Sequence, residues 1–483
     1  MAGQKILMIT HSELGQATIV LSVAHELLLR GCDVHIASFN ALSRPVEEMN
    51  ARAALLSDGP AKSATFHPVD GLSMAETYTK RWSESVFPTH LPGYDGVLDA
   101  FKTKSGKLMA CWTGPEYMKA HDSIVTIIKE IQPTLITVDS LFYQSIDACR
   151  TAGREFTILS ANSLKDHVFQ PWLATLWKYP FSGSGFPFPI PWRFFFKNIY
   201  LAIQVAIIYP KFPALKDLNT YRNEHGIPGP LATWETLQDK NIPYIIACSP
   251  EIDFPCQITE QFTTCGPILR PFRSIAVESP SLATWLAKAP TVLINLGSHL
   301  LTDTENMKQY IEAIQTLLDC RSDVQVLWKM KTLAGTDFKL EDFVDDSFTQ
   351  RVRTESWLNA DPACILESGN VVCMVHHGGA NSYNEAVWAG VPHIVLPVWF
   401  DTYDFASRVE YHGIGVWGSK KSAPKINGKE FGEAFRRVLA SEESETIRNK
   451  ALALRNQLSP IPGRVMACEK ILKLCGDHTD KTK

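Results

Sequence analysis

A junction between an apolar strand and a helix, near residue 376, constrains the fold of this chain more than any other feature. Residues 371–375 are apolar, residues 376–382 read HHGGANS, and a helical pattern follows. Glycines let a backbone approach a ligand closely, and Asn381 and Ser382 stand where a helix N-cap belongs, so free N–H groups there point outward. Glu385, one turn further on, can accept hydrogen bonds from a vicinal diol such as ribose. The junction therefore predicts a diphosphate site at a strand end.

Strands and helices alternate in both halves of the chain. Residues 5–10 and 33–38 are predicted strands that flank a helical pattern over residues 19–28, and such a unit implies a parallel sheet. The second half has four more predicted strands, at residues 291–296, 324–330, 371–375 and 393–396. At 483 residues, the chain is about three times as long as a typical domain. We therefore predict an α/β fold with two Rossmann-like parallel-sheet domains that face each other across a cleft.

The composition excludes several classes of function. Hydrophobic residues make up 45% of the chain and charged residues 20%, as in folded globular proteins. The formal charge is −4 and no basic run is long enough to neutralise several phosphates, so we expect no nucleic-acid partner. Residues 1–10 lack a signal-peptide pattern, and the eleven cysteines are spread singly without zinc-site spacing. These features predict a cytoplasmic, reduced protein.

An apolar, aromatic segment lies in the middle of the chain. Residues 186–192 read FPFPIPW, which predicts an irregular apolar wall; with Trp172, Trp177 and residues 194–196 this wall suggests a pocket for a flat, lipophilic molecule. Residues 198–209 are apolar but too few to span a bilayer. They predict a buried helix or the lining of such a pocket, with weak docking on a membrane surface as the alternative.

The motifs of other enzyme classes are missing from the sequence. No G-x-S-x-G elbow of a serine hydrolase occurs, and neither half has G-x-G-x-x-G after its first strand, as a dehydrogenase would. There is no D-x-D pattern to hold a divalent ion, and His376 with His377 would need further ligands at set spacing. We therefore expect no metal and no cofactor.

The junction at residue 376 continues into a longer pattern that resembles the nucleotide-sugar glycosyltransferases of the GT-B architecture. These UDP-glucosyl and UDP-glucuronosyltransferases act on small lipophilic acceptors. The matching positions cover nearly forty residues in register: His377, Gly379, Asn381, Ser382, Glu385, then Gly390-Val391-Pro392, Pro397, Asp401, Ala406, Val409-Glu410 and Gly413-Ile414-Gly415. The segment Gly15-Gln16-Ala17 is similar to openings found among fungal members of this family.

The resemblance implies a donor site in the second half of the chain. Its implied residues are His377, Gly379, Ala380, Asn381 and Ser382 for the diphosphate, Glu385 for the ribose, Asp401 for the sugar hydroxyls, Trp357 for stacking on uracil, and Ser298 for a phosphate contact. It also implies an acceptor domain over residues 1–270, a donor domain over residues 280–455, and a last helix within residues 456–475 that crosses back to the first domain.

The chain departs from the family pattern in two donor positions. Thr402 replaces the glutamine that usually follows Asp401, and Phe405 replaces a later asparagine. The amide that commonly helps to choose the sugar is therefore missing, although Thr402 stays a candidate donor residue. UDP-glucose is the first expectation for the donor.

The catalytic pattern of the first half also departs from the family. The position of the family's catalytic histidine falls on Gln16, and glutamine cannot act as a base. Asp139, at the end of a predicted strand, matches the aspartate that orients this histidine. Four explanations stay open: Asp139 is the base, Glu13 or His11 enters the cleft as the base, the acceptor is acidic enough to need none, or catalysis has been lost.

These observations predict an enzyme, a UDP-glycosyltransferase that transfers a hexose with inversion and without a metal. The acceptor is expected to be a small aromatic or lipophilic compound, such as a phenolic natural product of secondary metabolism, with O-glycosylation expected over C-glycosylation. The alternative is a catalytically silent protein of the same fold that binds a sugar nucleotide or a lipophile. Gln16 keeps that alternative open, and Glu385 with Asp401 argue against it.

Overall fold

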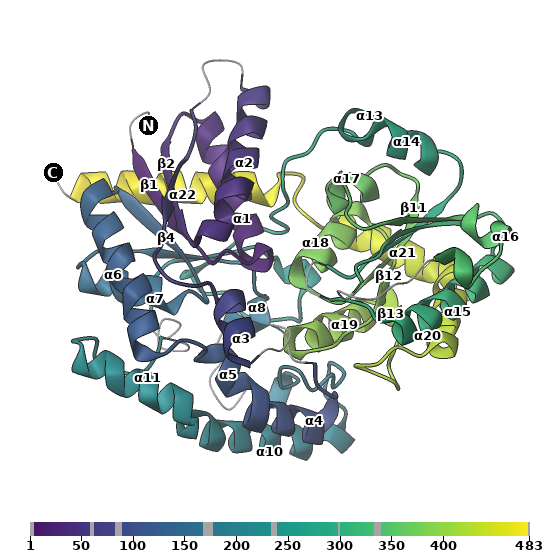
Figure 1. Ribbon diagram of the computed structural model, residues 1–483, viewed down its shortest axis with the longest axis horizontal. Helices are drawn as coiled ribbons and strands as arrows, with labels where there is room; N and C mark the ends of the chain where they lie inside the picture. The colour runs from purple at the N-terminus through teal and green to yellow at the C-terminus, as the bar shows by residue number, and fades with distance from the viewer. Residues whose placement is uncertain are drawn as a thin grey trace.

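The fold consists of two parallel sheets, one in each half of the chain (Figure 1). The computed structural model describes residues 4–57, 62–82, 89–167, 177–232, 239–297, 300–332 and 340–481. The first sheet has seven strands in the order β3-β2-β1-β4-β5-β6-β7, and the second has six in the order β10-β9-β8-β11-β12-β13. The predicted class, an α/β fold with two Rossmann-like sheets, is confirmed.

The strands of the first sheet are β1 (Lys5–Ile9), β2 (Asp33–Ser38), β3 (Thr65–Pro68), β4 (Leu135–Asp139), β5 (Thr157–Ser160), β6 (Tyr244–Ile246) and β7 (Phe262–Thr264). The helices of this half are α1 (Leu14–Leu29), α2 (Ser43–Leu56), α3 (Met74–Trp82), α4 (Gly93–Ala100), α5 (Gly106–Met109), α6 (Gly114–Ile131), α7 (Tyr143–Thr151), α8 (Leu164–His167), α10 (Trp192–Ile208) and α11 (Pro213–Glu224).

The strands of the second sheet are β8 (Thr291–Asn295), β9 (Gln325–Lys329), β10 (Val352–Glu355), β11 (Val371–His376), β12 (His393–Val395) and β13 (Gly415–Trp417). The helices that follow the first sheet in the chain are α13 (Ile275–Glu278), α14 (Pro280–Leu286), α15 (Thr304–Cys320), α16 (Asp346–Thr349), α17 (Pro362–Leu366), α18 (Ala380–Ala389), α19 (Phe400–His412), α20 (Gly428–Leu439), α21 (Glu443–Arg455) and α22 (Gly463–Lys481).

Apolar strands place the core on both faces of each sheet. In the first half, the buried side of α1 packs on the sheet together with Ala467, Cys468 and Ile471 of α22. Figure 1 shows α22 crossing the first half, where it contacts α1, although it follows the second sheet in the chain. The guanidinium of Arg464 also pairs with Glu26 of α1 at 2.8 Å. The end of the chain therefore completes the core of the first half.

Buried ion pairs join the two halves. The Nε atom of Arg408 on α19 donates to Asp253 at 2.6 Å, and Lys165 of α8 pairs with Asp404 of α19. Both pairs are buried, so removing one partner would leave an uncompensated charge. Tyr383 of α18 adds a hydrogen bond of 2.7 Å to the carbonyl of Ile252. Helices α18 and α19 therefore provide buried contacts to the first half, in addition to the packing of α22.

The aromatic segment in the middle of the chain differs from its prediction. Phe186 and Phe188 lie in an irregular stretch, as expected, but Phe188 stacks on Phe254 at 4.5 Å and contacts Tyr411 of α19 at 5.1 Å. Phe188 therefore packs at the interface between the halves, which the sequence pattern did not indicate, and the acceptor wall stays a prediction. The predicted buried helix over residues 198–209 begins earlier, as α10, and leaves one side exposed. Trp172 lies outside the described residues.

Candidate active site

The turn after β11 is shaped by two glycines that cannot be replaced without a clash. Gly378 has a φ of +90°, and a Cβ atom there would lie 2.6 Å from the carbonyl oxygen of Thr402. A Cβ atom on Gly379 would lie 2.5 Å from Nε2 of His377. Only glycine fits position 378, because both its left-handed φ and its contact with backbone exclude a side chain, whereas a side chain at position 379 would require the His377 ring to move. The predicted tight turn at this strand end is present.

A buried imidazole chain holds this turn. Nδ1 of His376 accepts a hydrogen bond of 3.1 Å from the backbone N–H of Gly378, and Nε2 lies 2.9 Å from Nδ1 of His393. Burial, and then the neighbouring His393 and His377, hold the pKa of His376 well below its usual value. His376 is therefore a neutral structural residue, and His377 is the imidazole beside the glycine turn.

The helix N-terminus differs in detail from its prediction. The N-cap of α18 is Gly379, whereas Asn381 and Ser382 belong to the first turn of the helix. The side chain of Asn381 donates instead to the carbonyl of Gly15 at 3.3 Å, across the two halves. Gly379 has no side chain to cap the first N–H groups, so these groups keep the orientation that binds an anion. Ala380 is the first residue of this helix.

Glu385 and Trp357 lie beside a lysine that sequence reasoning missed. The ammonium of Lys329, at the end of β9, lies 4.3 Å from the ring centre of the half-exposed Trp357 and 3.3 Å from the carbonyl of Gly297. Burial and then Lys331 lower the pKa of Lys329 to about 8, against the opposing charge of Glu385. One sequence signal could have identified Lys329: it is a cationic residue at the end of an apolar strand, in residues 325–329 (QVLWK).

Burial also dominates the electrostatics of Glu385. Removal from water, and then the charge of Asp361, raise the pKa of the Glu385 carboxyl well above its usual value, although Arg270 and Lys329 oppose this. A ribose diol that donates to this carboxylate would stabilise its ionised form. Ser298, the predicted phosphate contact after β8, lies outside the described residues.

The start of α19 contains two predicted donor residues, which differ in their exposure to solvent. The side chain of Thr402 is fully buried, and its hydroxyl accepts hydrogen bonds of 3.0 Å from the N–H groups of Val398 and Trp399. Thr402 therefore caps its own helix, and its role as a donor residue stays a prediction. Asp401 is an exposed residue at the second position of α19. Neighbouring protein atoms displace part of the water around its carboxyl, and this desolvation, then the charges of Asp166 and Asp404, raise its pKa to about 7.

Asp139, at the end of β4, is a structural acceptor in the first half. Its carboxylate accepts from the hydroxyl of Thr10 at 3.2 Å and from the N–H groups of His11 at 3.4 Å and Leu141 at 3.0 Å. Burial raises the pKa of Asp139, and the His11 side chain and these N–H groups oppose the shift. Because both oxygens already accept hydrogen bonds, Asp139 anchors the loop after β1.

His11 and Glu13 form a buried pair on this loop. Nε2 of His11 lies 3.1 Å from the carbonyl of Leu141, which can only accept, so Nε2 carries the proton. Nδ1 of His11 then faces Oε2 of Glu13 at 3.7 Å, and neither of these two buried atoms has a hydrogen-bond partner among the described residues. The ring of His11 stacks on Phe142 at 4.4 Å.

Gln16 takes no part in that pair. Its side-chain amide donates to Asn162 at 3.1 Å. The other oxygen of Glu13 accepts from the N–H of Ala75, and Ala75 lines a pocket of about 530 Å³ along α3. Of the four first-half candidates, the structure thus groups His11, Glu13 and Asp139 and turns Gln16 toward Asn162.

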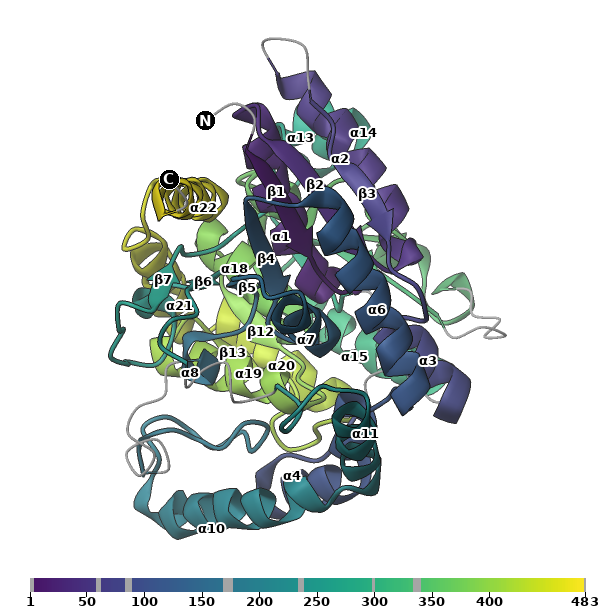
Figure 2. The same ribbon diagram turned by 90° about the vertical axis from the view of Figure 1, so that its left-hand side faces the viewer.

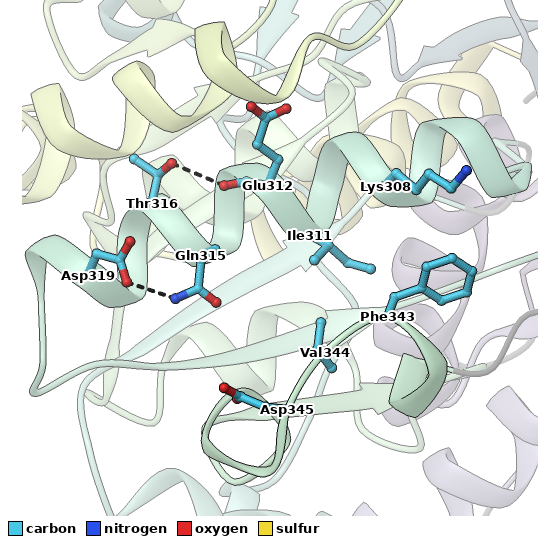
Figure 3. Close-up of a pocket in the computed structure, with 9 residues that line it drawn as sticks. All are labelled: Lys308, Ile311, Glu312, Gln315, Thr316, Asp319, Phe343, Val344 and Asp345. Carbon is cyan, nitrogen blue, oxygen red and sulfur yellow. Dashed lines mark hydrogen bonds between the residues drawn. The ribbon is translucent and has the colours of Figure 1, made fainter.

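A second pocket, of about 570 Å³, lies on the second half between α15 and residues 343–345 (Figure 3). None of the predicted site residues lines it. Two of its side chains bond within α15 itself, Gln315 to Asp319 and Thr316 to the carbonyl of Glu312. This pocket is therefore not part of the candidate active site. Among the described residues, no cluster of three or more His, Cys, Asp or Glu side chains has the arrangement of a metal site.

Two parallel-sheet halves, with the first turn of α18 in one half contacting the start of α1 in the other, define a glycosyltransferase of the GT-B fold. The chain belongs to the UDP-glycosyltransferase family of this fold. It is 35% identical to "Glycosyltransferase sdnJ" of Sordaria araneosa, over 98% of each chain. Residues 346–471 match the family described as "Erythromycin biosynthesis protein CIII-like, C-terminal domain".

Two further comparisons agree with this assignment. The chain is 38% identical to "Erythritol-mannosyl-transferase 1" of Mycosarcoma maydis over 100 residues, which cover 21% of this chain and 16% of that one. A crystal structure of Os79 from O. sativa in complex with UDP has a TM-score of 0.66 at 14% identity, over 98% of this chain and 100% of that one. The predictions of family, fold and enzyme class are confirmed.

Proposed function

We propose that this glycosyltransferase moves a hexose from UDP-glucose to a hydroxyl group of a small aromatic or lipophilic acceptor, with inversion and without a metal. The observation that carries the proposal is the contact between Asn381 on the first turn of α18 and Gly15 at the start of α1. It brings the N-terminus of α18 to a residue that follows Glu13 by two positions in the chain. The UDP complex of a protein with the same fold supports the nucleotide.

The donor half would hold the nucleotide by three kinds of contact. The N–H groups at Gly379 and Ala380, with the imidazole of His377, face the diphosphate and stabilise it as a leaving group. Glu385 accepts from the ribose, and the exposed face of Trp357 stacks on the base. Asp401 accepts hydrogen bonds from the sugar, and its ionised form does so more strongly.

We assign the base to His11. Leu141 fixes the tautomer in which Nδ1 of His11 has a lone pair, and Nδ1 accepts the proton of the acceptor hydroxyl. The acceptor oxygen forms a bond to the anomeric carbon while the bond from that carbon to the diphosphate breaks, and the electron pair leaves with UDP toward α18. Glu13 stabilises the imidazolium, and Asp139 holds the loop.

The test is a matrix of donors and acceptors with the purified protein. UDP-glucose, UDP-glucuronate, UDP-N-acetylglucosamine and GDP-mannose are each incubated with phenols, aromatic carboxylic acids and polycyclic alcohols, and products are analysed by mass. The mannosyl donor is included because one relative is named a mannosyl-transferase and the sugar-selecting amide is missing here. A hexose added from UDP-glucose to one acceptor supports the proposal. Transfer only from GDP-mannose overturns the donor assignment.

A second candidate, a silent protein that binds a sugar nucleotide, is favoured by one observation. Gln16 stands at the position of the family's catalytic histidine and bonds to Asn162. Calorimetric titration with UDP separates the two functions. Binding of UDP without product from any donor and acceptor pair would favour the silent protein.

A further inference from the structure

Helix α10 has two apolar sides, and only one of them is covered. On its inner side, the buried residues Leu201 and Val205 pack with Val97 of α4. On its outer side, five large apolar residues recur every three or four positions, which places them on one face of the helix. They are Trp192, Phe196, Tyr200, Ile203 and Ile207, with exposed fractions of 85, 76, 54, 42 and 47%.

This outer face is a patch and not a scatter of single residues. Isolated exposed apolar side chains are normal on protein surfaces, whereas contiguous ones mark an interaction surface. Five of the eighteen large exposed apolar side chains of the described residues lie on this one helix. Figures 1 and 2 show α10 at the outer edge of the molecule, beside α4 and α11.

The chain segment that carries the patch is basic, whereas α4 beside it carries the exposed Asp95 and Asp99. From residue 167 to residue 216 inclusive the sequence has no Asp or Glu and five Lys or Arg residues, in a chain whose formal charge is −4. Two of the five, Arg193 and Lys197, are exposed on α10 next to Trp192 and Phe196. A surface that is apolar and cationic together matches a partner that is apolar and anionic.

We propose that the outer face of α10 docks on an anionic lipid membrane, with the helix lying in the plane of the headgroups. Its apolar side chains enter the boundary between headgroups and acyl chains, and Arg193 and Lys197 pair with lipid phosphates. Trp192 and Tyr200 are of the types enriched at that boundary. The helix lies on the membrane and does not cross it, since no described helix is long and apolar enough to span one.

The same observations argue against a second copy of the chain as the occupant. A symmetric dimer through this face would pair the patch with itself and bring its own cations, Arg193 and Lys197, to both sides of the interface. Lipid docking would also bring the first half to the phase in which a lipophilic acceptor concentrates, a consequence that rests on the proposed function. The docking itself is independent of the reaction, and its test measures no activity.

The test is co-sedimentation of the full chain with vesicles of phosphatidylcholine alone or mixed with phosphatidylserine. The variant Phe196→Glu replaces a residue of the patch that is 76% exposed, and Leu55→Glu replaces one on α2 that is 70% exposed and serves as the matched control. We expect the wild type and the control to bind the mixed vesicles, and Phe196→Glu to bind at least about tenfold less. Arg193→Gln with Lys197→Gln should lose about tenfold at low salt.

Tryptophan fluorescence locates the contact. Emission should shift to the blue on addition of mixed vesicles, and Trp192→Phe should reduce that shift. Equal thermal unfolding of all variants shows that folding is intact. The proposal is overturned if the wild type does not bind mixed vesicles, if Phe196→Glu and Leu55→Glu bind equally, or if the wild type is a dimer that only Phe196→Glu dissociates.

Discussion

The donor half and the acceptor half are built from similar strand and helix units, but they depart from the family pattern to different degrees. In the donor half, the turn at Gly378 and Gly379 keeps the pattern, and the departure at Thr402 falls on a buried helix cap. In the acceptor half, the departure at Gln16 falls on the position that would remove the proton. The donor half therefore keeps its glycine turn, whereas the acceptor half needs a base other than residue 16, which the proposed function assigns to His11.

The strongest test of this comparison is the substitution His11→Ala. We expect turnover to fall by about 10² to 10⁴, the usual contribution of a positioned base, with no change in UDP affinity. Gln16→Ala is the matched control and should change turnover by a few-fold at most, because its side chain bonds to Asn162. Steady-state rates and UDP titrations measure both. If the His11→Ala protein is fully active, His11 is not the base.

A substitution in the glycine turn should abolish UDP binding by the donor half. Gly378→Ala places a Cβ atom 2.6 Å from the Thr402 carbonyl oxygen at a φ of +90°, so UDP binding should be lost and the free energy of unfolding should fall by about 2–4 kcal/mol. Gly369→Ala is the control, because Gly369 has a φ of +80° and open space around it. It should cost about 1–2 kcal/mol of stability and leave UDP binding intact. Equal UDP affinity in both variants would remove the turn from the site.

Stacking on the base is expected to contribute less. Trp357→Ala should weaken UDP binding about tenfold, within the range that base stacking on aromatic side chains usually contributes. Trp192→Ala, an exposed tryptophan of the other half, should leave the affinity unchanged. Isothermal titration with UDP measures both variants. Unaltered affinity in Trp357→Ala would place the base elsewhere.

The smallest expected effect is a dependence of donor affinity on pH. The pKa of Asp401 is raised to about 7, so its carboxyl is mostly protonated below that pH and ionised above it. Because the ionised form accepts sugar hydroxyls more strongly, affinity for UDP-glucose should rise a few-fold as pH increases through 7. Binding of UDP alone, and of UDP-glucose to Asp401→Asn, should lack this step. If the affinity for UDP alone rises in the same way with pH, the titrating group is not Asp401.

The donor half could be predicted in more detail than the acceptor half because its elements are contiguous in the sequence. Strand, turn and helix follow each other from Val371 to Ala389, so local spacing predicts their arrangement. The N-cap was misplaced by two residues or more, because the side chain of Asn381 is used for a contact with Gly15 that no local pattern contains. Lys329 was missed because its contacts, with the ring of Trp357 and the carbonyl of Gly297, also join residues that are distant in the sequence.

In the acceptor half, the decisive contacts are distant in sequence. The N–H of His11 bonds to Asp139, 128 residues away, and Leu141 selects the tautomer of the ring. The sequence named His11, Glu13 and Asp139 as alternatives, and only their arrangement distinguishes an anchor from a base. An exposed side of α10 was implied only by the alternative prediction for residues 198–209, because an apolar helix reads as buried until its neighbours are known.

The packing of α22 on α1 affects how this protein can be recombined with its relatives. Ala467, Cys468 and Ile471 are core residues of the first half, although they are encoded after the second. Consider a hybrid that joins the first half of this chain to the second half of a relative at one crossover. The last helix of the relative would then pack into the core of the first half in place of α22. Two crossovers, the second before Gly463, would keep each core with its own sequence.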